Sequence, residues 1–218
     1  RDAARRLAES MVGVGQAMGK RVVAYLTRME EPLGLMVGNA CEVQESLDVL
    51  RGQGPRDVRS LVVTLGGAMV ELAHGVSFSE GAARIESVLD NGEALGRFER
   101  MVRAQGGDLS ALPGVSGETP VLAAEDGYVG AIDGLEVGLC GVALGAGRTQ
   151  ADQAVDHRVG IRIEAPRGMA VRRGEPLVTV LHGMSGEPPL AIIERLGRAF
   201  HVTSREPEPV DLVLERID

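Results

Sequence analysis

The spacing of the apolar residues changes along this chain of 218 residues, and the change falls at residues 107–120. Before this stretch the apolar residues recur every three or four positions, which predicts amphipathic helices. After it they gather in short runs, which predicts strands. The stretch itself, GDLSALPGVSGETP, is rich in Gly, Pro and Ser and follows neither period. We therefore expect two domains, residues 1–106 and 121–218, joined by a linker at residues 107–120.

The first domain is expected to be the tail of a helix-covered, mixed-sheet α/β domain. Its first helix should end near Gly19, with these apolar residues on one face: Leu7, Met11, Val14 and Met18. The apolar run at residues 22–26 predicts a strand covered on both faces, as in a parallel α/β sheet. Further helices are expected around residues 42–50, 55–72, 79–89 and 95–102. Ser79 is predicted to cap one of them.

The second domain is expected to be a smaller, β-rich α+β domain with a barrel-sandwich-like fold. Strands are predicted at residues 127–132, 135–143, 159–163, 175–181 and 210–214, with a helix inside residues 186–201. Biotinyl and lipoyl carriers share this rhythm, but a carrier needs a lysine at its hairpin tip. Lys20 is the only lysine of the chain, so the architecture is expected without the carrier function.

Charge and composition exclude several classes of protein. The net charge of −8 and the aromatic content of 2% argue against a nucleic-acid partner. No apolar run approaches the roughly 20 residues of a membrane span, so we expect no membrane partner and a cytoplasmic protein. Cys41 and Cys140 lie in different predicted domains, and we interpret them as buried thiols.

No arrangement of side chains in the sequence predicts a nucleophile with its base. The four histidines lack metal-ligand spacing, and no serine lies in a GxSxG elbow. We therefore expect no catalytic residue in this chain.

Residues 32–50, PLGLMVGNACEVQESLDVL, form a glycine-marked loop that runs into a helix. Glu42, Glu45 and Asp48 are three residues apart and so share one face of that helix. Hard cations bind several oxygen ligands at once, and carbonyls of the loop at residues 33–36 next to Glu45 would supply part of such a set. A solvated acidic face is the alternative.

The segment LGAGR places Gly145 and Gly147 beside Arg148. Backbone N–H groups and a guanidinium can meet an anion in such a turn. The segment lacks the lysine and hydroxyl of a P-loop and the full glycine spacing of a dinucleotide site. A tight turn with a surface arginine is the alternative, and the best functional interpretation is a loop that faces another domain.

Several segments, in this order, resemble the pyrimidine-nucleoside phosphorylase and thymidine phosphorylase family. They are RVVAYLTRMEEPLGLMVGNACEVQESLDVLRGQGPRDVRSLVVTLGGAMVELA, VLDNGEALGRFERMVRAQGGD, EDGYVGAI, GLCGVALGAGRTQADQAVDHRVGI and RRGEPLVTVLH. The resemblance implies an enzyme of pyrimidine salvage with an α domain and a larger α/β domain. It implies reversible phosphorolysis of uridine, thymidine or deoxyuridine, in which phosphate as co-substrate displaces the base to give a pentose 1-phosphate.

The same resemblance implies that the main substrate-binding residues lie in an N-terminal half without counterpart here. This chain is then the C-terminal half of an enzyme that is a homodimer when complete, and it is expected to be inactive alone. A structural potassium or calcium ion is implied at the carbonyls of Leu33 and Met36 and at Glu45, with Glu42 and Asp48 as solvated neighbours. The alternative is a non-enzymatic, partner-binding module derived from this family.

Overall fold

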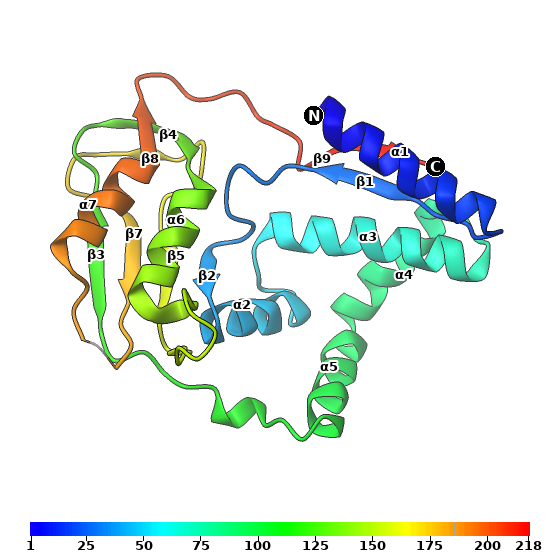
Figure 1. Cartoon of the computed structure of the whole chain (residues 1–218), viewed down its shortest axis with the longest axis horizontal. Coiled ribbons are helices and arrows are strands. Elements are labelled where there is room, and N and C mark those ends of the chain that lie inside the picture. Colours follow the sequence, from blue (N-terminus) through cyan, green and yellow to red (C-terminus); the bar gives the residue numbers. More distant parts are fainter. Residues whose placement is uncertain (185) are drawn as a thin grey trace. The chain divides into compact units, whose positions relative to one another are not determined.

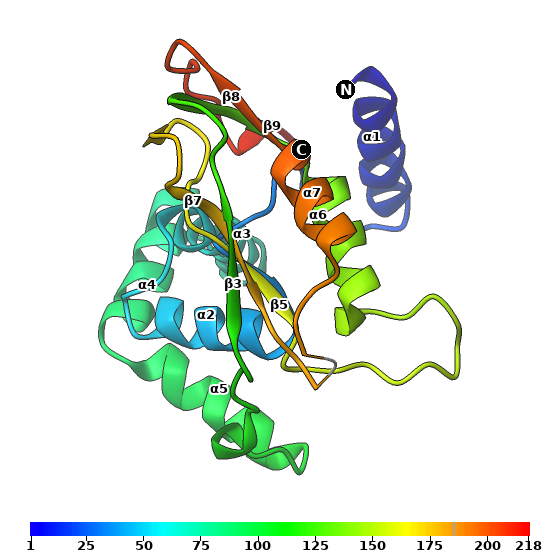
Figure 2. The same cartoon turned by 90° about the vertical axis from the view of Figure 1, so that its left-hand side faces the viewer.

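The computed structural model describes residues 1–184 and 186–218 (Figures 1 and 2). The helices are α1 (Asp2–Ala17), α2 (Ala40–Leu50), α3 (Arg56–His74), α4 (Phe78–Asp90), α5 (Glu93–Ala104), α6 (Gly134–Gly141) and α7 (Leu190–Ala199), with short turns η1 (Leu109–Ala111) and η2 (Val142–Ala146). The strands are β1 (Ala24–Thr27), β2 (Met36–Gly38), β3 (Glu118–Leu122), β4 (Gly127–Ile132), β5 (Gly160–Ile163), β6 (Ala170–Val171), β7 (Pro176–Leu181), β8 (Phe200–Thr203) and β9 (Val213–Ile217).

The chain folds into two compact units that alternate along the sequence. Unit 1 contains Arg1–Arg28, Val49–Gly96 and Val210–Asp218, and unit 2 contains Met29–Asp48 and Arg97–Pro209. The predicted domain limits, residues 1–106 and 121–218, are contiguous and remain a prediction. β3 begins inside the expected linker, at Glu118.

Unit 1 is built on the antiparallel pair β1 and β9, with Ala24 opposite Ile217. The strand expected at residues 22–26 is therefore present, but the predicted parallel, doubly covered environment is wrong. Its residues are half-buried, and its partner is the last strand of the chain. The apolar run indicates a strand, but it does not determine whether the neighbouring strand runs parallel or antiparallel to it.

α3 and α4 pack tightly against each other in unit 1, and glycine makes this possible. A Cβ on Gly81 would overlap the Gly67 carbonyl oxygen, and one on Gly67 would lie 2.9 Å from the Ala82 nitrogen. α4 begins at Ser77, whose Oγ accepts a hydrogen bond from the Glu80 N–H at 3.2 Å. The predicted cap at Ser79 is wrong by two residues.

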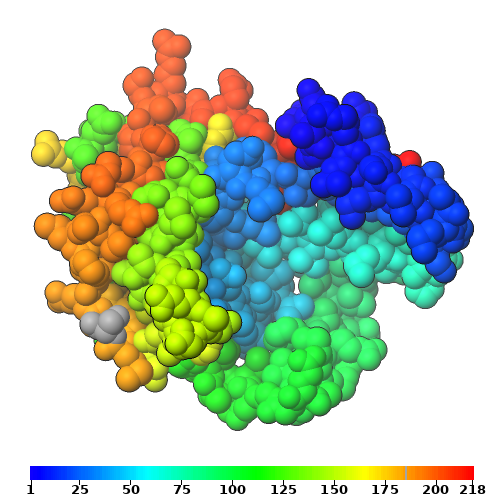
Figure 3. All heavy atoms as spheres, viewed as in Figure 1, coloured from blue at the N-terminus to red at the C-terminus, as the bar shows by residue number. Residues whose placement is uncertain are grey.

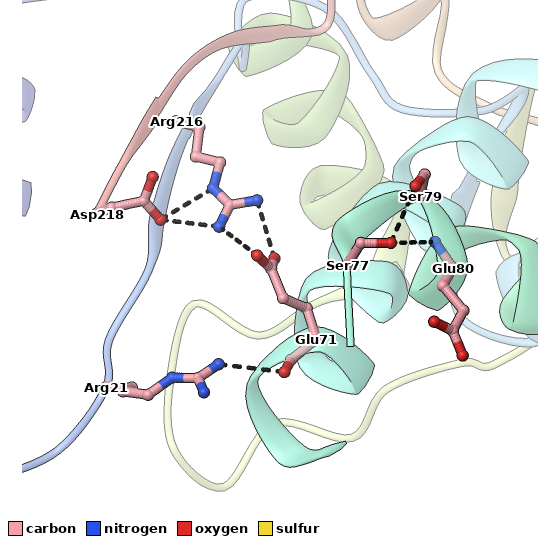
Figure 4. A network of polar contacts seen from close by, with 7 residues as sticks. All are labelled: Arg21, Glu71, Ser77, Ser79, Glu80, Arg216 and Asp218. Carbon is pink, nitrogen blue, oxygen red and sulfur yellow. Dashed lines mark hydrogen bonds and ion pairs between the residues drawn. The ribbon is translucent and has the colours of Figure 1, made fainter. Parts of the chain in front are cut away.

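An ionic network joins β9 to α3 within unit 1 (Figure 4). The Arg216 guanidinium lies 2.9 Å from Glu71 Oε2 and 2.8 Å from Asp218 Oδ1. It also lies over the rings of Tyr25 and Phe78, at 5.9 and 5.7 Å from their centroids. Residues from β1, α3, α4 and β9 are therefore held around one guanidinium.

Unit 2 contains two antiparallel sheets, with strand orders β2-β5-β7-β3 and β6-β4-β8. Every residue of β7 from Leu177 to Leu181 is buried, so this strand is covered on both faces. The largest fully buried side chains of the core are Ile161, Leu196, Val129, Val137, Val178, Val180 and Cys140. The fold is thus mixed α and β with several small sheets, and the barrel-sandwich assignment remains a prediction.

The strand predicted at residues 135–143 is wrong, because this segment forms helix α6. Asp133 caps the helix by accepting a hydrogen bond from the Glu136 N–H at 2.9 Å. Val137, Cys140 and Gly141 are buried at helical spacing. Glu136 then pairs with Arg195 of α7 at 2.7 Å. Capping and packing therefore outweigh the β-prone composition of the segment.

Within residues 1–184 and 186–218, no single helix combines the length and apolar content of a membrane span. α3 and α4 reach that length and composition only as a pair, which bends by 119° between them.

Candidate functional site

The junction between β2 and α2 in unit 2 brings two predicted carboxylates onto the preceding loop. Glu45 Oε1 accepts a hydrogen bond from the Leu35 N–H at 2.8 Å, and Glu42 Oε1 accepts one from the Gly38 N–H at 2.8 Å. Asp48 accepts one from Gln44 at 3.1 Å on the same helix. Glu45 therefore lies against the segment that contains Leu33 and Met36. The hydrogen bond from Gln44 to Asp48, by contrast, stays within α2.

The carbonyl of Met36 faces the open edge of its sheet. Met36 lies opposite Arg162 in the antiparallel ladder, and the Ile163 N–H donates to the Leu35 carbonyl at 2.7 Å. Because hydrogen-bonded and non-hydrogen-bonded pairs alternate, Met36 is in a non-hydrogen-bonded pair and its carbonyl points away from β5. β2 is an edge strand. The Gly38 N–H also points away from β5, and it donates a hydrogen bond to the Glu42 carboxylate.

These donors fit a hard cation in part. Carboxylate and backbone carbonyl oxygens are the ligands that calcium and similar ions prefer. Across residues 1–184 and 186–218, no group of three or more His, Cys, Asp and Glu side chains is arranged to hold a metal. A cation at Leu33, Met36 and Glu45 would therefore depend on backbone carbonyls for most of its ligands from this chain.

The predicted loop with Gly145, Gly147 and Arg148 follows α6 directly. Gly145 has φ +106, a conformation that favours glycine, and its carbonyl accepts the Asp156 N–H at 3.0 Å. Arg148 donates to the Ala151 carbonyl at 3.3 Å and is exposed. In this structure Arg148 therefore makes a contact within its own loop.

Asn39 connects this loop to the β2–α2 junction. Its Nδ2 donates to the Ala146 carbonyl at 2.6 Å, and the N–H of Ala40 donates to the His157 carbonyl at 3.2 Å. The loop is thus attached at both of its ends to the turn that precedes α2. The sequence patterns predict the two segments separately and do not indicate Asn39. An Asn before a helix is normally expected to cap it, so the sequence contained no signal for this bond.

A cavity of about 650 Å³ lies in unit 2 beside the same loop, and Asp156, His157, Arg158 and His182 are among its lining residues. Asp156 accepts hydrogen bonds from the N–H groups of Met184 and Arg158, which lower the pKa of its carboxyl below the ordinary value. His182 is 9% exposed, and its Nε2 lies 2.7 Å from Thr119 Oγ1. These hydrogen bonds therefore stabilise the wall of the cavity.

The two cysteines are structural. A Cβ on Gly38 would lie 2.8 Å from Cys41 Sγ, so the small residue leaves room for the thiol. Burial raises the pKa of the Cys41 thiol and also that of Cys140. A raised pKa keeps both thiols protonated near neutral pH, and neither is suited to nucleophilic attack. The interpretation as buried thiols is confirmed for Cys140, whereas Cys41 is half-buried.

Two family models match the chain in order. The model described as "Glycosyl transferase family, a/b domain" matches residues 1–95. The model described as "Pyrimidine nucleoside phosphorylase C-terminal domain" matches residues 128–202.

The curated relatives carry the same names. The pyrimidine-nucleoside phosphorylase of Bacillus subtilis (strain 168) is 40% identical over 184 residues, which cover 81% of this chain and 42% of the relative. Human thymidine phosphorylase is 39% identical over 231 residues, covering 97% and 48%. The thymidine phosphorylase of Mycobacterium tuberculosis (strain H37Rv) is 42% identical over 215 residues, covering 98% and 49%.

The chain spans about half the length of the curated relatives it matches. The order of the two matched domains and the level of identity agree with the resemblance that the sequence segments carry. The chain belongs to the pyrimidine-nucleoside phosphorylase and thymidine phosphorylase family.

Proposed function

We propose that this chain is the C-terminal portion of a pentosyltransferase that phosphorolyses pyrimidine nucleosides. The observation that carries the proposal is a match over 98% of the chain, at 42% identity, to about half of a thymidine phosphorylase. In the proposed reaction phosphate attacks the anomeric carbon of the nucleoside, and the free base leaves as a pentose 1-phosphate forms. Catalysis of this kind rests on positioning and charge stabilisation.

The main substrate-binding residues of this reaction are assigned to an N-terminal half. Support for that assignment comes from the relatives, because the match to this chain takes in only about half of their length. The cytoplasmic location and the homodimeric state belong to the same proposal. So does the role of Gly145, Gly147 and Arg148 as a loop that faces another domain.

The activity is tested with uridine, thymidine and inorganic phosphate, using this chain alone and mixed with the N-terminal half of the B. subtilis relative. We expect release of free base only from the mixture. Robust turnover by the chain alone would contradict the assignment of the substrate-binding residues. A stable mixture without turnover would favour the alternative, a partner-binding module without enzymatic activity.

A potassium or calcium ion is proposed at the carbonyls of Leu33 and Met36 and at Glu45. Support comes from the contact of Glu45 with the loop and from the direction of the Met36 carbonyl. The ion should stabilise the fold by about 0.4 kcal/mol when its concentration equals the dissociation constant. Unfolding in potassium chloride or calcium chloride, against choline chloride, measures this effect.

Glu45→Gln should abolish the stabilisation by the ion while keeping an acceptor for the Leu35 N–H. Asp48→Asn is the matched control on the same helix face and should retain it. Equal stabilisation of the wild-type chain and the Glu45→Gln chain would rule out this ion site.

A further inference from the structure

Helix α2 connects the candidate ion site to the loop at residues 146–157. Glu45 lies in its second turn, and Asn39 stands immediately before its first residue, Ala40. The Val43 N–H donates to the Asn39 carbonyl at 3.2 Å, so Asn39 takes part in the first turn of the helix. From Ala40 to Glu45 the helix rises by about 7.5 Å. Because hydrogen bonds hold these turns together, a displacement of Glu45 is shared by Asn39.

Strand β2 forms a second connection, through its close approach to β5. The Met36 carbonyl is a candidate ligand, and two residues later Gly38 lies opposite Gly160 of β5. A Cβ on Gly38 would lie 2.8 Å from the Val159 carbonyl oxygen, so the two backbones are in close contact. Segments packed this closely transmit a shift to each other. A movement of β2 therefore reaches β5, the strand that follows the loop at residues 146–157.

The turn between β2 and α2 closes the base of this loop. Asn39 Nδ2 donates to the Ala146 carbonyl at 2.6 Å, and the Ala40 N–H donates to the His157 carbonyl at 3.2 Å. Figure 3 shows the loop, in yellow-green, beside the blue residues of β2 and α2. The Arg148 guanidinium donates to a carbonyl of the loop itself. Opening of the two bonds at the base therefore releases the segment that carries Arg148.

The ion ligands and the loop thus share one support. Glu45 accepts the Leu35 N–H in the same arrangement in which Asn39 holds the loop. The conformation that brings the candidate ligands together is therefore also the one in which the base of the loop is closed. An ion that binds this conformation better shifts the population towards it. Linkage makes the effect reciprocal, so a closed loop should raise the affinity for the ion.

We propose that a cation bound by Leu33, Met36 and Glu45 keeps the loop at residues 146–157 closed, with Asn39 as the positioning residue that couples the two. This inference rests on the proposed ion site. It adds a regulatory role to that site, because the availability of the ion would set the position of a loop that is proposed to face another domain.

The coupling is measured by amide hydrogen exchange of this chain in potassium chloride, in calcium chloride and in choline chloride of equal ionic strength. The dependence of the free energy of unfolding on ion concentration gives the dissociation constant. At ten times that concentration, exchange in residues 147–154 should be slower by up to about 10-fold. Residues 105–115 of the same unit should exchange equally in all three salts. This comparison uses the wild-type chain and depends on no variant.

Asn39→Ala separates the coupling from ordinary stability, because it removes the amide donor without adding a charge. The ion should still stabilise this variant against urea, but it should no longer slow exchange in the loop. If Asn39 only stabilised the loop, its loss would accelerate exchange by the same factor with and without the ion. Glu45→Gln should lose both effects of the ion. Gln44→Ala, on the same helix, should retain both.

The possible failures are distinguishable. Stabilisation of the wild-type chain by the ion with unchanged loop exchange would overturn the inference and leave the ion site in place. Absence of stabilisation by either ion would overturn the ion site and the inference together. A loop in the Asn39→Ala chain that still responds to the ion as in the wild type would overturn the coupling role of Asn39.

Discussion

Asn39 joins two segments that are 107 positions apart in the sequence. Its side-chain amide donates to a carbonyl at the start of the loop at residues 146–157, and the N–H of the next residue, Ala40, donates to the His157 carbonyl at the other end of the loop. On folding, the part-buried Ala146 carbonyl exchanges water for the Asn39 amide as its hydrogen-bond partner. Removing that donor leaves the carbonyl without a partner, which costs free energy. One side chain therefore sets the position of the whole loop relative to the candidate cation site.

Asn39→Asp should destabilise this attachment, because a carboxylate of the same size cannot donate to the Ala146 carbonyl. We expect a loss of about 1–3 kcal/mol in the free energy of unfolding, measured in urea. Amide hydrogen exchange should accelerate in residues 147–154. Gln44→Ala, which removes an exposed hydrogen bond on the same helix, is the control and should leave the loop unchanged. Normal protection of the loop in the Asn39→Asp chain would show that the bond is not needed.

Asp156 links stability to pH. Hydrogen bonds from the N–H groups of Met184 and Arg158 lower the pKa of its carboxyl below the ordinary 3.8. The stability that the ionised carboxyl contributes to the fold is therefore fully present above pH 3.8. The contribution is lost as the pH falls through the lowered pKa of the folded state. Asp156→Asn should lower the free energy of unfolding at pH 7 by about 1–2 kcal/mol and flatten its fall below pH 3.8. Urea unfolding from pH 7 downwards measures both, with Asp152→Asn on the same loop as control. An unchanged slope would contradict this role.

The sequence predicted part of the candidate site. The spacing of Glu42, Glu45 and Asp48 indicated a shared helix face, and the resemblance singled out Glu45, which does contact the loop. Asn39 was missed because its partner, the Ala146 carbonyl, is 107 positions away in the sequence. Local patterns describe the neighbours of a residue along the chain, but they carry little information on such long-range pairing.

At the scale of elements, long periodic segments were predictable and short apolar ones were not. The stripe of α3 predicted a helix that the structure contains at Arg56–His74. Residues 135–143 are rich in Val, Leu and Gly, and a short apolar run does not distinguish a strand from a buried helix. The Asp133 cap and the Glu136–Arg195 pair decide for helix α6. Of these two contacts, only the Asp133 cap joins residues close enough in the sequence to be predicted from a local pattern.

The close crossing of α3 and α4 makes Gly81 intolerant of any side chain. Gly81→Ala should lower the free energy of unfolding by about 1–3 kcal/mol, because the new methyl group overlaps the Gly67 carbonyl. Gly13→Ala in α1 is the matched control, since no atom lies within 4 Å of its added Cβ. That change should instead stabilise by about 0.5–1 kcal/mol through helix propensity. Thermal or urea unfolding of both variants tests the contrast, and equal effects would contradict the proposed overlap.

At the scale of the whole molecule, unit 1 depends on contacts between the two ends of the chain. Arg216 lies in the last strand, whereas its partners Tyr25 and Glu71 lie in the first 71 residues. The Glu71 and Arg216 side chains are 21% and 29% exposed, so their pairing is only partly screened by water.

Arg216→Met should lower the free energy of unfolding by about 2–4 kcal/mol, since the half-buried Glu71 carboxylate loses its partner. Adding Glu71→Gln should recover part of this loss, because the unpaired charge is removed. A double-mutant cycle in urea gives the coupling between the two residues. A coupling near zero would mean that the network in Figure 4 does not stabilise unit 1.

The alternation of the two units also orders events during synthesis. The chain crosses between them after Arg28, Asp48, Gly96 and Pro209. β1 is synthesised well before its partner β9, because most of both units lies between Ala24 and Ile217. Until β9 emerges, the edge of β1 that it covers is open, a condition that favours aggregation or chaperone binding. Residues 213–217 therefore decide when that edge of residues 24–27 is protected.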